Sequence, residues 1–233
     1  MAKAKRGWIV TKHGPLQKID DNLWAIEGDV PGVPLKRRMS IVRMADGSLT
    51  FFHAIPLDDA TLQEVKSLGR PAYLVLGHHQ HAIDAHAFQQ KLGLLAYGPK
   101  ACEDMLRNRI ELSGTLETFP ADANISVESV PGTKLCETMV TVKSGERTSL
   151  LFSDVIQNNP KETTALPFRL MGFAGGPKVP WVFRKLFIKD RGELKAALSK
   201  WSADPGLKRL VPFHGTIVEN NAARALADAS AAL

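Results

Sequence analysis

The chain has 233 residues, of which 44% are hydrophobic and 23% charged, and its formal net charge is +6. These proportions are ordinary for a globular protein with a sizeable core. Two cysteines exclude a disulfide framework, and the absence of an apolar run of about 18 residues argues against a membrane span. We therefore expect a cytoplasmic protein with no membrane partner. The basic residues are spread along the chain, which favours a solvated basic surface over a nucleic-acid interface.

The first half of the chain predicts strands followed by an alternation of helices and strands. Residues 1–7 are expected to form a disordered tail, and 8–233 a single domain. Short strands are predicted at 7–10, 22–28 and 39–55, the last folding back at Asp46-Gly47. The expected order across 56–108 is helix, strand, helix, strand, helix, with helix ends at Gly69 and Gly93. Such alternation indicates parallel strands joined by right-handed crossovers.

The second half repeats this order. Strands are predicted at 124–130, 137–146, 148–154 and 208–213, a helix at 192–201, and a final helix capped by Asn220. Residues 166–188 do not fit the pattern, because this apolar and aromatic stretch is interrupted by glycines and prolines. The alternatives for it are a loop over a pocket, a subunit contact in a homodimer, or two short buried helices.

The histidines gather in one stretch. Four of the seven, namely His78, His79, His81 and His86, lie close together around Asp84. Imidazole and carboxylate groups bind zinc, iron and manganese, and the stretch follows an apolar strand, where open α/β sheets place their ligands. If the stretch is extended, residues two apart point the same way, so His79 and His81 face one ion while His78 points away. The plain structural alternative makes Asp84 an N-cap and His86 an ordinary helix residue.

Two distant residues extend the pattern. Asp154 ends the apolar strand "TSLLFSD", and His214 ends "LVPFH". Alone, an aspartate after a strand is usually a turn former, and a single histidine is usually structural. Their order after the histidine-rich stretch makes the combination more specific.

In this order, "HQHAIDAH", "LLFSD" and "VPFHG" resemble the motifs of the metallo-β-lactamase superfamily, over about residues 20–230. The resemblance implies an αββα sandwich made of two βα halves. It also implies a metal-dependent hydrolase, in which a metal-bound hydroxide attacks an ester, thioester, amide or phosphoester. Carried over residue by residue, it implies one or two zinc or iron ions and a catalytic role for Asp84. The implied metal ligands are His79, His81, Asp84, His86, Asp154 and His214.

The sequence departs from the family motif at three places. Two residues separate His81 from Asp84 where the family has one, Ala85 precedes His86, and Thr133 stands where the family has a histidine. Cys136 and Glu137 are the candidates to replace that histidine. The early part resembles an uncharacterised branch in which the motif is commonly eroded, so the alternative function is a metal-free binding or scaffold protein.

The partner class follows from size. The nucleases of this superfamily carry an inserted domain, for which 233 residues leave no room. A small-molecule substrate is therefore favoured over nucleic acid, and its identity lies beyond the sequence because loops set specificity on such a scaffold.

Overall fold

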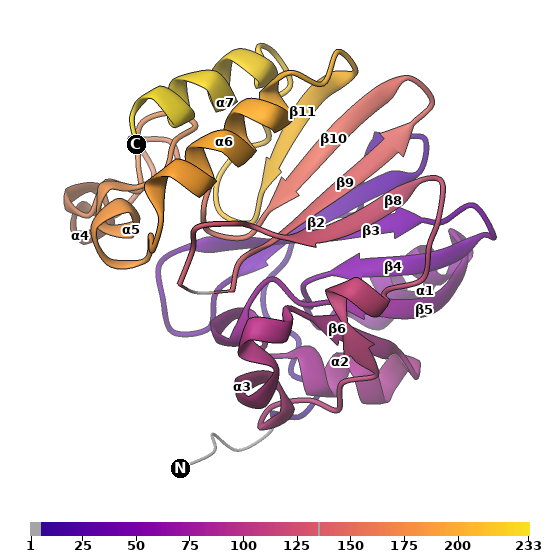
Figure 1. Cartoon of the computed structure of the whole chain (residues 1–233). Coiled ribbons are helices and arrows are strands. Elements are labelled where there is room, and N and C mark those ends of the chain that lie inside the picture. The colour runs from indigo at the N-terminus through magenta and orange to yellow at the C-terminus, as the bar shows by residue number, and fades with distance from the viewer. Residues whose placement is uncertain (1–5, 135) are drawn as a thin grey trace.

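The computed structural model describes residues 6–134 and 136–233, so most of the tail expected at 1–7 lies outside the described residues. Two sheets form its centre (Figure 1). The first runs in chain order through β1 (Gln17–Asp20), β2 (Leu23–Asp29), β3 (Lys36–Arg43), β4 (Ser48–Phe52), β5 (Arg70–Val75), β6 (Leu95–Gly98) and β7 (Gly114–Thr115). The second has the order β11 (Leu207–Pro212), β10 (Arg147–Phe152), β9 (Thr138–Ser144) and β8 (Ile125–Ser129).

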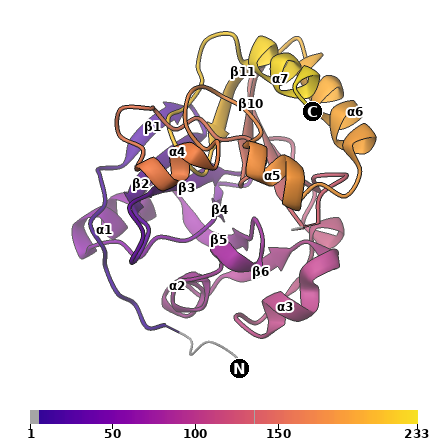
Figure 2. The ribbon, with the colours of Figure 1, turned by 90° about the vertical axis from the view of Figure 1, so that its left-hand side faces the viewer.

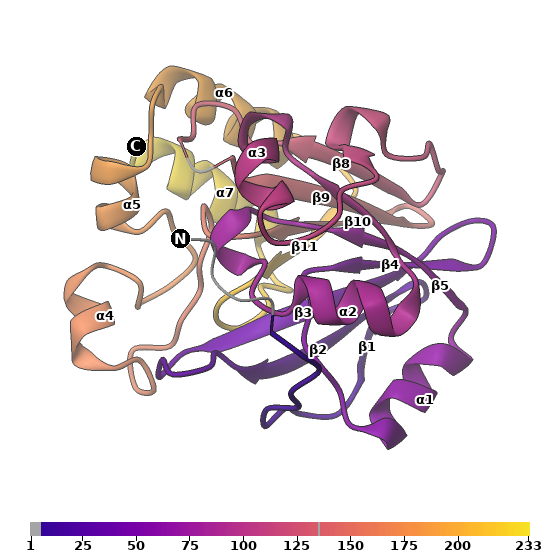
Figure 3. The ribbon, with the colours of Figure 1, turned by 90° about the horizontal axis from the view of Figure 1, so that it is seen from below.

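Helices cover the outer face of each sheet. On the first sheet lie α1 (Asp59–Ser67), α2 (Ala85–Leu92) and α3 (Glu103–Arg107), and on the second lie α6 (Arg191–Ser202) and α7 (Ala222–Ala231) (Figures 1 and 3). The predicted parallel segment is present, because β4, β5, β6 and β7 pair in parallel. In the second sheet β10 pairs in parallel with β11.

Strand alternation divides the core into three layers. Successive side chains point to opposite faces of a strand. Leu150 and Phe152 therefore pack outward against α6 and α7, while Leu151 packs inward against the first sheet. In the first sheet Ile41 packs towards α1 and α2, whereas Val42 faces the second sheet. The result is the predicted four-layer αββα sandwich.

Local signals set most of the element ends. Asp58 caps α1 by accepting a hydrogen bond from the Thr61 backbone N–H at 2.9 Å, and Gly93 ends α2 with φ +66°. Two predictions were wrong. Residues 7–10 form no strand, and α7 begins after Asn221, not Asn220.

Residues 166–188 hold two short helices, α4 (Leu166–Leu170) and α5 (Trp181–Leu186), at one edge of the sandwich (Figure 2). Two helices were among the alternatives, but they are not fully buried. Leu166, Leu170, Trp181 and Leu186 are exposed. Among the residues that the structure describes, no helix is long and apolar enough to cross a membrane.

Candidate metal centre

The candidate centre lies where several strands end between the two sheets. His78 follows β5, Asp154 follows β10, and His214 follows β11. Parallel strands bring their carboxyl ends to one edge of a sheet, which is where open α/β folds bind ligands. The structure therefore joins three of the segments that the sequence pointed to, although not always through the predicted side chains.

A 3₁₀ turn decides which histidines face the centre. Residues His79–His81 form this turn, and His78 caps it. Side chains three apart are eclipsed in a 3₁₀ helix, so His78 and His81 lie on the same side, with ring centroids 4.0 Å apart. The expected pairing of His79 with His81 assumed an extended chain, in which the period is two. In the structure His78 lies in the centre together with His81, whereas His79 packs edge-on against His78.

Asp154 lies near three histidine side chains. One carboxylate oxygen lies 3.0 Å from His78 Nε2 and 3.3 Å from His81 Nε2, and the other lies 3.6 Å from His214 Nε2. His78, His81 and Asp154 each offer a ligand atom within 4.8 Å of the other two. Three imidazoles thus converge on one carboxylate.

Burial sets the protonation of this cluster. It lowers the pKa of His214 to about 4, and it also lowers the pKa of His81, while Asp154 opposes both shifts. Burial alone would raise the pKa of Asp154, but His81 and His78 hold it well below its usual range. At neutral pH the site thus offers neutral imidazoles and an ionised carboxylate, the forms that bind metal ions.

Hydrogen bonds assign the tautomers. His214 Nδ1 lies 2.6 Å from the Lys36 carbonyl oxygen, to which only an N–H can donate, so Nε2 keeps its lone pair towards Asp154. His78 is set the other way. Its Nδ1 accepts from the Gln80 backbone N–H at 3.1 Å, so the neutral ring carries its proton on Nε2 and donates to Asp154. His214 is therefore pre-set as a ligand, and His78 as a hydrogen-bond donor.

Glu137 is the group that comes closest to replacing the missing histidine. Its side chain is fully buried, with Oε1 3.5 Å from His78 Nε2, and Oε2 accepts from the Asp154 backbone N–H at 2.8 Å. Burial, with the neighbouring Asp154 charge, raises the pKa of Glu137 well above its usual value. Thr133 instead donates its hydroxyl to the Val130 carbonyl. Cys136 is buried in the core of the first sheet.

His53 adjoins the centre and was not predicted. It follows β4, has φ +68°, and packs against Phe213 with ring centroids 4.1 Å apart at a tilt of 41°. Its Nε2 lies 3.2 Å from Ser153 Oγ. Strand-end position, the signal that pointed to Asp154 and His214, applies equally to "FFH" and could have found it.

The remaining predicted ligands lie outside the cluster. Asp84 occupies the N-cap position of α2, but its side chain caps no backbone N–H and instead forms a buried ion pair with Arg37, whose Nη2 is 2.7 Å from Oδ2. His86 is on α2, and His79 stacks edge-on against His78. Roles for these three side chains in metal binding, and for Asp84 in catalysis, remain predictions.

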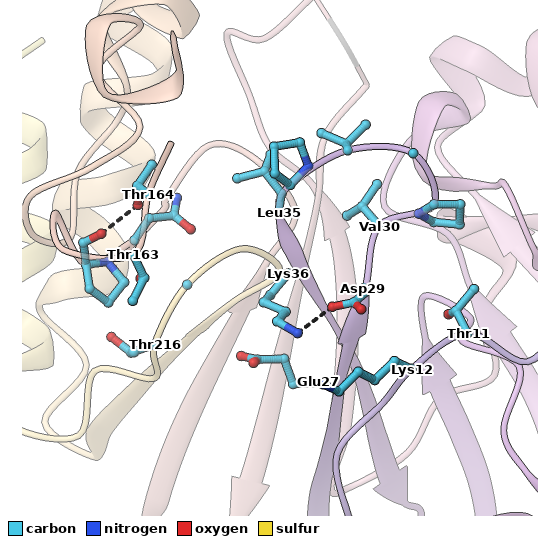
Figure 4. Close-up of a pocket in the computed structure, with 17 residues that line it drawn as sticks. Thr11, Lys12, Glu27, Asp29, Val30, Leu35, Lys36, Thr163, Thr164 and Thr216 are labelled. Atoms are coloured by element: carbon cyan, nitrogen blue, oxygen red, sulfur yellow. Dashed lines mark hydrogen bonds and ion pairs between the residues drawn. The ribbon is translucent and has the colours of Figure 1, made fainter. Parts of the chain in front are cut away.

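Two cavities adjoin the centre. The smaller, about 90 Å³, is lined by Arg37, His81, Phe213 and His214 among others. The larger, about 820 Å³, lies between the β2–β3 loop and residues 159–164 and 215–216 (Figure 4). Val30 and Leu35 line both, so the β2–β3 loop borders the two spaces. In the larger one Lys36 is paired with Asp29, while Thr163, Thr164 and Thr216 lie on the opposite wall.

Solved structures share this architecture. A structure of the metallo-β-lactamase DIM-1 exposed to ceftazidime matches with a TM-score of 0.63 and 13% identity, over 97% of this chain and 99% of its own. The chain has the metallo-β-lactamase fold. A structure of TMB-1 matches with a TM-score of 0.61 and 14% identity, over 96% and 98% of the two chains. By sequence the chain matches no family model and no curated protein. At these identities the likeness establishes the metallo-β-lactamase fold, and function has to be argued from the residues.

Proposed function

We propose that the protein is a hydrolase that depends on a single metal ion held by His81, Asp154 and His214. Three protein ligands with an open position are the usual form of a catalytic zinc site. The observation that carries the proposal is the cavity. His81 and His214 line it directly, so an ion that they held together with Asp154 would be accessible to a reacting group in that cavity.

The protonation of the donor set suits such an ion, while the described donors that already lie within 4.8 Å of one another are those of His78, His81 and Asp154. His81 and His214 are neutral imidazoles, Asp154 is the one ionised carboxylate among them, and the Lys36 carbonyl fixes the tautomer of His214. A histidine ligand whose second nitrogen donates to a backbone carbonyl is a recurring arrangement around zinc. When bound, a divalent ion supplies Lewis acidity and lowers the pKa of a coordinated water.

The neighbouring side chains orient the proposed ligand Asp154 and enclose the small cavity. His78 donates to Asp154 and fixes the position of its carboxylate, while Glu137 accepts from the Asp154 backbone N–H. Phe213 and the Val30 and Leu35 side chains wall the small cavity and limit access of bulk water. The larger cavity accommodates the rest of the substrate, which its size suggests is a small molecule. Zinc or iron is the expected ion, and the cytoplasm the expected location.

Metal content tests the proposal. Protein purified without chelator should hold about one equivalent of zinc or iron, as a three-ligand site requires. His214→Ala should lose the ion and the ability to hydrolyse a panel of esters, thioesters and phosphoesters. His86→Ala is the matched control, because His86 lies outside the cluster, and it should keep both. Content below about a tenth of an equivalent in the wild type would contradict the proposal and favour a metal-free binding protein.

A further inference from the structure

Arg37 is a buried cation that the proposed function does not use. Its side chain is 2% exposed and that of Asp84 is 1% exposed, with 2.7 Å between Nη2 and Oδ2. Its Nε donates to the Asp29 carbonyl at 3.1 Å. Arg6 approaches Asp84 from the surface, at 3.7 Å from the other carboxylate oxygen. An arginine held this firmly at a cavity wall is part of a built site.

The position of the guanidinium is informative. Arg37 lines the small cavity together with His81 and His214, so the guanidinium and two of the proposed metal ligands border the same space. Asp84, which the sequence offered as a metal ligand, has its charge neutralised by Arg37 instead. A carboxylate in a buried ion pair is available to a metal ion only if its partner leaves, which would strand a buried positive charge.

The charges of the proposed ligands and of Arg37 also favour a single ion. A metal ion is bound by neutral imidazole and by ionised carboxylate, so among His81, His214 and Asp154 only Asp154 would bring a negative charge. One divalent ion therefore already leaves a net positive charge there. A second ion beside it would add two more positive charges next to the guanidinium in a dry space, where repulsion between like charges is strong.

From these observations we propose that Arg37 acts as a fixed cation in place of a second metal ion. Its guanidinium pairs with the Asp84 carboxylate, so that this carboxylate binds no ion and the centre holds only one. This rests on the proposed function for the first ion. The part that concerns Arg37 is separate, because it predicts how the number of bound ions changes when the guanidinium is removed.

The test counts zinc ions in the full-length protein by native mass spectrometry and elemental analysis. Arg37→Met should bind one equivalent more than the wild type, because the Asp84 carboxylate, no longer paired with the guanidinium, becomes free to bind an ion. Arg37→Lys, which keeps the charge, should bind the wild-type number. Arg37→Met/Asp84→Asn should lose the extra equivalent. Added zinc should also raise the thermal midpoint of Arg37→Met more than that of the wild type.

The outcomes separate the two proposals. The wild-type count reports on the proposed function, whereas the difference between Arg37→Met and the wild type reports on Arg37. Equal counts in these two proteins would overturn the inference, and so would a second tightly bound equivalent in the wild type. The wild-type measurement keeps the inference falsifiable if Arg37→Met does not fold.

Discussion

Asp84→Asn tests whether the Arg37–Asp84 pair is buried as the structure shows. The substitution keeps the shape of the side chain but leaves the guanidinium of Arg37 buried without its carboxylate. Breaking a buried pair by removing one partner costs about 3–5 kcal/mol, because the remaining charge is uncompensated. For a domain of this size each kcal/mol shifts the thermal midpoint by about 2–4 °C, so we expect a fall of about 6–20 °C.

Thermal unfolding followed by circular dichroism, with chelator present so that no ion compensates, measures this fall. Asp228→Asn is the matched control, because Asp228 pairs with Arg224 on the surface, where the side chains are 63% and 80% exposed. Exposed pairs contribute little, so this control should leave the midpoint almost unchanged. Arg37→Met/Asp84→Asn should lose less than the sum of the single losses, since no lone charge remains. An effect of Asp84→Asn as small as that of the control would refute the buried pair.

Three further substitutions test the framework of the site. Gly77→Ala should lower the free energy of unfolding by about 3 kcal/mol or more, since the new Cβ would lie 1.8 Å from Ser153 Oγ. Gly7→Ala is its control, because a Cβ at that position would meet nothing within 4 Å. Denaturant unfolding of the two variants measures the difference in their stability. Thr138→Val should lower the free energy of unfolding by about 1 kcal/mol, because Thr138 Oγ1 donates to the Leu76 and Gly77 carbonyls at 2.9 and 3.0 Å. Urea unfolding measures this loss, and the dependence of the free energy on urea concentration should stay unchanged. Asp20→Asn should destabilise the protein at pH 7. Arg147 and Arg209 hold the pKa of Asp20 well below its unfolded value of about 3.9, so this contribution is present above that pH and is lost as the pH falls further. The difference between wild type and Asp20→Asn should therefore shrink below about pH 4, and a difference that stays constant down to pH 2 would contradict the assignment.

The order of helices and strands was predictable because it depends on signals that survive in a single sequence, whereas the αββα arrangement was implied by the resemblance of the three motifs. Apolar periodicity separated helices from strands, and Asp58 and Gly93 marked helix ends where the structure has them. Strand-end position identified Asp154 and His214 for the same reason. Chain order alone then related these residues to the histidine-rich stretch.

The details of the centre were not predictable, because they depend on local geometry and on distant contacts. His78 was set aside because an extended chain has a period of two, whereas the 3₁₀ turn has a period of three. The spacing of "HHQH" fits both readings, and only the packed structure selects one. Arg37 carried no signal at all, since a charged residue at a strand start is usually solvated.

The start of β3 ties the separate parts of the centre together. Three consecutive residues there reach two different segments, the end of β11 and the start of α2. The Lys36 carbonyl accepts from His214, the Arg37 side chain pairs with Asp84 at the start of α2, and Arg38 donates to the Pro212 carbonyl at the end of β11. Consecutive side chains on a strand point to opposite faces, so one short segment can bind the histidine-rich stretch on one side and the second sheet on the other. The tautomer of His214 and the ion pair of Asp84 therefore depend on one strand end, and a displacement of that segment would disturb the proposed ligand and the fixed cation together.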